Sequence, residues 1–392
     1  MRRVLATLGL ILATSSAVST VSAAEVKLGA WGRGFFVPFF SDGDSDAQTF
    51  DAASWGANYP RIGVSIIGSS DNAGFQIDLN GDNGIGAHDQ QKIWIKPFNM
   101  LTVTIGRAYD DVLRGNGAFG DFNWLRISGT GEDFTFHRVS THDGAYAPVV
   151  TPYDQTKPAP NTFGSIIALD PMKELHAYVA FKSLTTSMKT EDAFKNIQVG
   201  LGYNIAEKAH IRAQYVGVTT PGTGEGDEAD ASVINAALKL TLTESFYADL
   251  GTFIPTDKAV SAYTAKIAAY INYKTGAIAL HGLGNFVAGT KNVKGDDATG
   301  MELGLGFDYA IGDNGLGFVS SFRYQNDAFQ GGAGVEDGRI GGLVGIQKGF
   351  SNGKIGIGFE FSTTNMAFNG GEPAPALEKA TIAVPVIVEY SF

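Results

Sequence analysis

One twelve-residue stretch of the chain carries oxygen-bearing side chains at a spacing that could bind a metal ion. Asp78, Asn80 and Asp82 take alternate positions at its start, and Asp89 takes its last position. Calcium prefers about six to eight oxygen ligands gathered on a tight loop, so these four residues are candidate calcium ligands. The sixth position is Asn83 where a calcium loop carries glycine. A polar hairpin loop without metal is therefore the alternative.

Charged side chains with apolar neighbours on both sides recur along the chain. Successive side chains of a strand point to opposite faces, so each such charge would face away from the apolar side chains beside it. A basic residue that faces lipid at mid-depth costs about 2–4 kcal/mol, so these charges are expected to point into a pore. Rings of charge set the ion preference of pores. The candidate pore-lining residues are Arg33, Arg61, Lys92, Lys96, Arg212, Lys266, Glu302, Asp308, Arg323 and Glu360.

No arrangement of residues singles out an enzyme. The histidines have no zinc-binding spacing, and no Gly-x-Ser-x-Gly sequence is present. Gly115–Gly120 matches the glycine pattern of dinucleotide-binding loops but lacks the strand and helix that such a loop requires. The net charge of −11 disfavours binding to nucleic acid. We expect no catalytic residue, no cofactor apart from calcium, and no nucleic-acid partner.

The segment Thr381–Phe392 shows which kind of element would position the charges. Its apolar residues fall on every second position from Ile382 to Phe392, which is the period of a strand with one apolar face. This segment resembles the terminal strand of bacterial outer-membrane β-barrels, whose insertion machinery reads alternating apolar residues that end in a C-terminal phenylalanine. The resemblance implies that Tyr390 and Phe392 form an assembly signal, and that the barrel-assembly machinery and outer-membrane lipid are partners.

The rest of the chain repeats this unit. From Glu25 onward, segments of about nine to twelve alternating residues are separated by breaks that are short and long in turn. Short breaks such as Gly312–Gly315 are rich in turn residues, and long breaks include Val37–Ser54 and Gly81–Asp89. The pattern predicts an all-β fold, a single transmembrane antiparallel up-and-down β-barrel with short periplasmic turns and long extracellular loops. A soluble sheet that buries its apolar face in a core is the alternative.

The breaks predict about 20 strands, with 18 or 16 as alternatives. The least distinct strands are Asp121–Ser128 and Gly164–Leu169. Pairing of Val26–Phe36 with Thr381–Phe392 would close the barrel, and Pro385 would then need a bulge because proline has no N–H for the ladder. Three strands have glycine at alternate positions, which predicts glycines on the inner face: Val199–Tyr203, Leu303–Phe307 and Ile355–Phe359.

The first residues predict export. Arg2 and Arg3 precede the apolar run Val4–Ala13, and small residues follow up to Ala23. This is typical of a cleaved signal peptide, so residues 1–23 are a predicted signal and 24–392 the predicted barrel. Removing Arg2 and Arg3 would lower the net charge from −11 to −13. The absence of cysteine is compatible with an oxidising compartment. We expect the protein in the outer membrane.

A barrel of this predicted size is too wide for side chains to fill, so a channel or a plug must occupy it. General porins, which the chain resembles loosely, place a basic wall opposite an acidic loop folded into the pore. Tyr109–Gly120 follows about the fifth strand, where the constriction loop of that family lies. The resemblance implies that Asp110, Asp111 and Arg114 constrict the pore, that small hydrophilic solutes or ions diffuse through it passively, and that the protein forms a homo-trimer.

Two other functions stay open at this stage. A surface-exposed barrel could act as an adhesin or interaction protein through acidic loops such as Val37–Ser54 and Thr141–Asn161. A substrate-selective channel would instead have an apolar internal pocket and a plug. The sequence does not identify the transported solute or the ion that the pore prefers.

Overall fold

In the computed structural model, the described residues are 25–41, 48–52, 61–81, 85–108, 164–182, 197–206, 208–217, 219–221, 228–230, 232–256, 264–292, 294–328, 338–363 and 380–392. Every regular element among them is a β-strand. Within these ranges no helix has the length and apolar character needed to cross a membrane. The predicted signal peptide lies outside the described residues.

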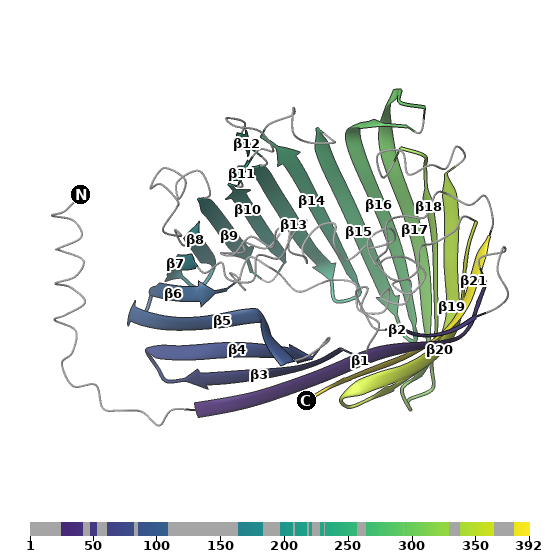
Figure 1. The fold of residues 1–392 in the computed structure, drawn as a ribbon, viewed down its shortest axis with the longest axis horizontal. Coiled ribbons are helices and arrows are strands. Elements are labelled where there is room, and N and C mark those ends of the chain that lie inside the picture. The colour runs from purple at the N-terminus through teal and green to yellow at the C-terminus, as the bar shows by residue number, and fades with distance from the viewer. Residues whose placement is uncertain are drawn as a thin grey trace.

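Eighteen of the described strands form one closed antiparallel barrel (Figure 1). Each wall strand pairs with the next one along the chain, and the last pairs with the first. The wall strands are β1 (Glu25–Ser41), β3 (Arg61–Ser69), β4 (Ala73–Gly81), β5 (Ile85–Phe98), β6 (Leu101–Arg107), β7 (Gly164–Met172), β8 (Leu175–Lys182), β9 (Gln198–Ile205), β10 (Ala209–Val216), β13 (Val233–Thr243), β14 (Phe246–Pro255), β15 (Ala265–Thr275), β16 (Ile278–Lys291), β17 (Asp297–Ile311), β18 (Leu316–Gln325), β19 (Arg339–Phe350), β20 (Gly353–Ser362) and β21 (Thr381–Ser391). Short strand β2 (Gln48–Ala52) pairs antiparallel with the end of β1, and β11 (Thr219–Pro221) pairs with β12 (Glu228–Asp230).

The all-β barrel is therefore confirmed, with the alternative count of 18 in place of about 20. The strand count differs because two strands were expected between β6 and β7. These two strands instead pair directly with each other, from Leu101 opposite Leu169 to Gly106 opposite Gly164. Gly164–Leu169 is a wall strand, as predicted. The other indistinct strand, Asp121–Ser128, lies outside the described residues.

Short turns join the strands at the end of the barrel where β1 begins and β21 ends. The turn after Ile311, for example, ends before Leu316, as the break Gly312–Gly315 predicted. Two predicted long breaks are partly wrong, because β1 continues to Ser41 and β5 already begins at Ile85. The continuation of β1 through Val37–Phe40 is apolar, as a strand in lipid can be. In β5 the polar residues before Asp89 do not mark a loop, since one face of each strand is itself polar.

The barrel closes between β1 and β21, where Trp31 pairs with Ser391 and Ser41 with Ile382. The predicted partner strands are correct, but the predicted pairing range in β1 is shifted. Its first residues pair with β3 instead, because the strands of a closed barrel are staggered. The register shifts between Phe36 and Phe39, so two residues of β1 lie opposite the single Pro385. This bulge is the one that the proline required.

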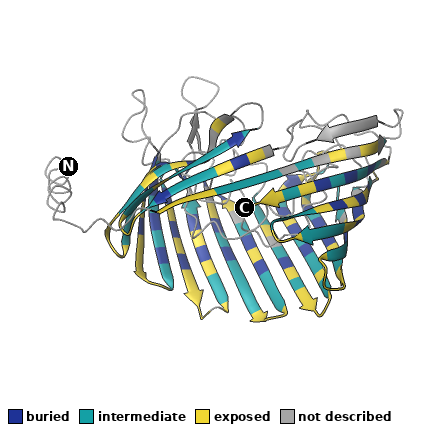
Figure 2. Cartoon of the chain, turned by 90° about the horizontal axis from the view of Figure 1, so that it is seen from below, coloured by how far each residue is buried: buried dark blue, intermediate teal, exposed yellow. Residues whose placement is uncertain are grey.

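Buried and exposed side chains alternate along the strands (Figure 2). The exposed positions are apolar, with Phe75 at 45%, Leu305 at 70% and Val388 at 47% exposure. The positions between them hold charges, of which Arg212 is 8% and Glu360 0% exposed. Because apolar side chains face out and charges face in, the soluble alternative is excluded, and the outer face suits a lipid environment.

The alternating glycines face inward, as predicted. Their apolar neighbours are exposed on the outer face, with Leu201 at 51% and Ile357 at 51%. The inner face of β9, β17 and β20 therefore carries no side chain at these positions. The buried glycines are Gly200, Gly202, Gly304, Gly306, Gly356 and Gly358.

Candidate functional site: the inner wall of the barrel

Basic side chains lie at several inward positions from β10 to β15. We call His210, Arg212, Lys239 and Lys266 the basic patch. His210 and Lys239 are cross-strand partners, and Lys239 is in turn the partner of Asp249. Asp249 is 1% exposed, and the positive charges of Lys239 and Arg212 act on its carboxylate. Nearby cations offset part of the cost of burying that charge.

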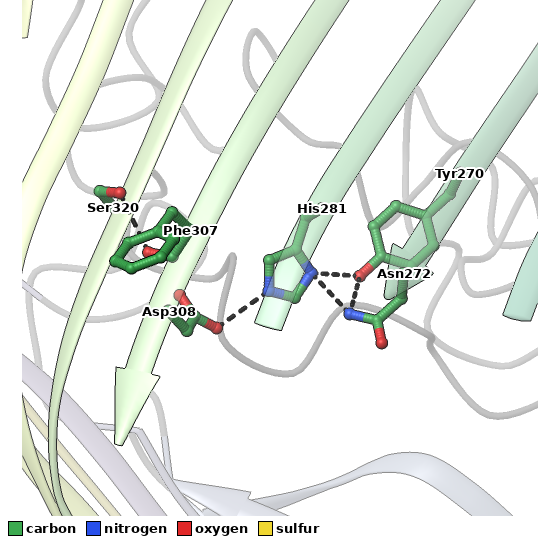
Figure 3. A network of polar contacts seen from close by, with 6 residues as sticks. All are labelled: Tyr270, Asn272, His281, Phe307, Asp308 and Ser320. Carbon is green, nitrogen blue, oxygen red and sulfur yellow. Dashed lines mark hydrogen bonds and ion pairs between the residues drawn. The ribbon is translucent and has the colours of Figure 1, made fainter. Parts of the chain in front are cut away.

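A polar network spans β15, β16 and β17 on the same inner face (Figure 3). His281 Nδ1 lies 2.6 Å from the hydroxyl oxygen of Tyr270 and 2.9 Å from Nδ2 of Asn272. On the other side of the ring, Nε2 lies 3.0 Å from Oδ2 of Asp308. A carboxylate only accepts hydrogen bonds, so Nε2 donates to Asp308, and Nδ1 of the neutral ring accepts from Tyr270 and Asn272.

The basic patch and this network are joined by aromatic rings. Lys239 Nζ lies 5.1 Å from the ring centroid of Tyr247, within the range of a cation–π contact. The rings of Tyr247 and Tyr270 are 5.7 Å apart between centroids. A continuous line of side chains therefore crosses five neighbouring strands, with an ammonium group at β13 and a carboxylate at β17.

Acidic side chains lie beyond this line, on β17 and β20. Asn285 Nδ2 donates to Glu302 Oε2 at 2.9 Å, and Glu302 is 1% exposed. Glu360 is 0% exposed. Near the closing seam, Lys354 Nζ lies 3.6 Å from Glu389 Oε2. Among the described inward side chains, cations predominate on β10–β15, whereas Glu302, Asp308 and Glu360 outnumber Lys354 on β17–β20.

Two tryptophans cover inward glycines on the first strands. A Cβ on Gly63 would lie 2.3 Å from the Trp31 ring, and one on Gly74 would lie 2.2 Å from the Trp94 ring. Lys92 Nζ lies 6.0 Å from the ring centroid of Trp94. Lys92 is half-buried on the inward row of β5, whereas Lys96 is exposed near the short-turn end of that strand.

Three predicted lining arginines are placed only by their backbone. Arg33 pairs with Arg61 on one side and with Glu389 on the other, and Arg323 pairs with Gly304. These registers put all three on the inward-facing rows of β1, β3 and β18. The predicted constriction residues Asp110, Asp111 and Arg114 lie outside the described residues.

Of the candidate calcium ligands, Asp78 and Asn80 lie on the inner face of β4. Asp78 Oδ1 accepts hydrogen bonds from the Ser65 hydroxyl at 2.6 Å and from the Gln76 side-chain amide nitrogen Nε2 at 3.0 Å. Asp82 lies outside the described residues, and only the backbone of Asp89 is placed, in β5. The described residues contain no group of three or more acidic or histidine side chains that could hold a metal ion. Calcium binding stays a prediction.

A small apolar cluster on the inner wall of β6–β8 is closed to solvent. Ile166 is 3%, Tyr178 3% and Ala180 1% exposed, although the barrel register points all three inward. Ala108, at the end of β6, belongs to the same cluster and is 1% exposed. If open water filled the lumen beside this cluster, its side chains would be exposed. Their burial shows that water does not fill the lumen at this part of the wall.

Tyr247, Trp31 and Trp94 were not predicted as lining residues. Each has the inward parity of its strand, so period-two counting could have found them. The predicted lining residues were chosen for their charge, so these three rings were left out.

No protein-family model and no curated protein matches this chain. Among solved structures, it is similar to OpdL of Pseudomonas aeruginosa, at 11% identity and a TM-score of 0.53, covering 94% of this chain and 99% of OpdL. It is also similar to OccAB4 of Acinetobacter baumannii, at 9% identity and a TM-score of 0.51, covering 95% and 99% of the two chains. These likenesses show that the chain shares their barrel fold.

Proposed function

We propose that the protein is an outer-membrane channel through which small hydrophilic solutes or ions diffuse passively. The observation that supports this proposal is the division of the wall into two faces. Large apolar side chains such as Leu305 are exposed on the outside, while the basic patch, Glu302 and Asp308 lie on the inside. Lipid would surround the outer face, and a polar pathway would run along the inner one.

The charge distribution suggests how the channel would discriminate between solutes. Anions would follow the basic patch on β10–β15, and cations would follow the acidic side chains on β17–β20. The constriction would lie beside β6–β8, where the apolar cluster that includes Ile166 and Tyr178 is closed to solvent. Asp110, Asp111 and Arg114 follow β6 directly in the chain and are the proposed constriction residues. Export by a signal peptide and assembly into a homo-trimer belong to the same proposal.

Single-channel recording in planar bilayers tests this function. Purified protein should give discrete conductance steps, and vesicles that contain it should swell in solutions of small sugars or amino acids. A correctly folded barrel that gives neither conductance nor swelling would contradict the proposal. Binding of surface partners by the acidic loops, without any solute flux, would favour the adhesin alternative.

A further inference from the structure

The outer face of β15, β16 and β17 has a depression that the side chains around it do not fill. Its volume is about 580 Å³. Residues directly opposite one another on neighbouring strands share a face, and Ile271 and Leu305 are 48% and 70% exposed. The rows to which these two belong therefore point outward, away from the lumen. One row is Ala269, Gly284 and Leu303, and the next is Ile271, Gly282 and Leu305.

The floor of the depression is the glycine-bearing part of β16. A Cβ on Gly284 would lie 3.3 Å from the Phe286 ring and 3.8 Å from Leu303 Cδ2, so a side chain could be added there with little displacement. The backbone beneath is paired with β15 and β17. The floor therefore needs no further hydrogen-bond partner, and its surface is apolar between Ile271 on one side and Leu305 on the other.

Elsewhere on the outer face, aromatic rings cover outward glycines. A Cβ on Gly68 would collide with the Phe75 ring, and one on Gly342 would lie 2.7 Å from the Phe361 ring. Such a ring replaces the contacts that a strand loses at glycine. At Gly284 the Phe286 ring touches only the edge of the site, so the depression stays open to the surroundings of the barrel.

The depression extends towards the end of the barrel that carries the long connections. Gly282 and Gly284 are the fifth and seventh residues of β16, which begins at a short turn. Tyr324 and Ile340 also line the depression, and they lie at the end of β18 and the start of β19, beside the long connection between these strands. Tyrosine is enriched at the level of lipid headgroups. The depression therefore opens towards the leaflet nearer to the long loops.

An acyl chain matches the depression in chemistry and width. An empty space would forfeit dispersion contacts, and water has few hydrogen-bond partners on an apolar floor. Neighbouring strands are about 4.8 Å apart, so a depression one strand wide admits a single flexible chain of methylene groups. Lipid already surrounds the rest of this face, so the depression is continuous with an apolar medium that can enter it.

A second copy of the barrel matches the depression less well. Leu305 is 70% exposed at its edge, so a neighbouring wall would rest on this side chain before it reached the floor. Protein interfaces carry about one hydrogen bond per 100–200 Å². Among the described residues that line the depression, Tyr324 has the only polar side chain.

We propose that this depression, which we call the acyl groove, binds one acyl chain of a membrane lipid in the leaflet nearer to the long loops. The inference goes beyond the channel function, because it requires only that lipid surrounds the outer face. Solute passage and lipid binding can therefore be tested separately.

The test is photocrosslinking from the lipid. The folded protein is reconstituted into phosphatidylcholine vesicles in which part of the lipid carries a diazirine on its acyl chain, and mass spectrometry locates the adducts formed by light. Peptides that contain Ala269 and Gly284 should carry severalfold more adduct than peptides from the outer face of β3–β5. An even distribution over the outer face of the unmodified protein would overturn the inference.

The variant Ala269→Leu/Gly284→Leu fills the floor with apolar side chains. It should lower the adduct yield on β15–β17 to the level of the rest of the wall. Ala236→Leu is the matched control, since it enlarges an outward alanine of β13 whose partners are Ala213 and Thr252. It should leave the yield on β15–β17 unchanged. Heat-modifiable gel mobility shows whether each variant is folded, and a folded filling variant that keeps the full yield would contradict the acyl groove.

Sedimentation in detergent distinguishes a lipid from a second copy. With lipid in the acyl groove, the unmodified protein and the filling variant should have the same oligomeric state. If a second copy covers the groove, the filling variant should lose its oligomers, and the unmodified protein should lack adducts at Ala269 and Gly284. That pair of results would replace the proposed lipid by a partner barrel.

Discussion

The backbone of Phe392 exchanges two hydrogen bonds with Ala30 of β1, at 2.8 Å from its N–H and 2.7 Å to its carbonyl oxygen. Its side chain is 68% exposed, and its ring packs edge-on against Tyr390 with centroids 5.0 Å apart. The backbone of Phe392 thus completes the closing seam, whereas its ring adds little burial to the folded barrel.

Replacement of this ring should therefore affect assembly more than stability. Phe392→Ala should lower the amount of barrel that reaches the outer membrane of cells severalfold, because the resemblance assigns the ring to recognition by the assembly machinery. Refolding of the same variant into detergent should be almost unchanged. Membrane fractionation and heat-modifiable gel mobility measure the two effects. Equal losses in cells and in detergent would assign the ring a structural role instead.

A charge placed on the outer face should destabilise the barrel. Leu305→Lys replaces a side chain that is 70% exposed to the lipid side, and its expected cost is about 2–4 kcal/mol near mid-depth. Asp313→Lys, in the short turn between β17 and β18, is the control and should cost much less. Urea unfolding in lipid vesicles measures both. Equal costs would indicate that Leu305 does not contact lipid.

A large side chain placed on the inner face should narrow the pore. Gly306→Phe adds a ring that points into the lumen, because Gly306 is buried on the inner row of β17. Leu305→Phe adds similar bulk to the adjacent outward position and serves as the control. Single-channel conductance should fall clearly for the first variant only. A fall in both would point to distortion of β17 instead of occlusion.

The basic patch should compensate the buried carboxylate of Asp249. Asp249 is 1% exposed, and Arg212 and Lys239 are the cations that act on its carboxylate. Arg212→Gln leaves it with Lys239, its cross-strand partner. Removing one member of a buried ionic group typically costs about 3–5 kcal/mol, and Asp249→Asn in the same chain should recover part of that loss. Unfolding free energies of the two single variants and the double variant measure the coupling. Additive losses would show that Arg212 and Asp249 do not interact.

Charge removal should shift ion selectivity in opposite directions on the two halves of the wall. Lys239→Gln should lower the permeability of chloride relative to potassium, and Glu302→Gln should raise it. Both side chains lie on inward rows, so each substitution changes one charge at the wall. Zero-current potentials at one fixed pH measure the shift. A common direction for both variants would contradict the proposed separation of ion paths.

The sequence by itself determined the two faces of the wall. The alternation in Thr381–Phe392 and the glycine pairs such as Gly304 and Gly306 specify which side chains face lipid, because a strand has a local period of two. It also indicated the bulge at Pro385, since the missing N–H of proline is a property of one residue. These are local features, and each was found in the structure where the pattern placed it.

Only the tertiary structure decided the strand count and the identity of neighbours across the wall. The direct pairing of β6 with β7 depends on hydrogen bonds between residues that are more than fifty positions apart, such as Gly106 and Gly164. The contact of His281 with Asp308, and the line from Lys239 through Tyr247 to Tyr270, depend on the register of several strands at once. Register follows from barrel closure and stagger, which couple all the strands together.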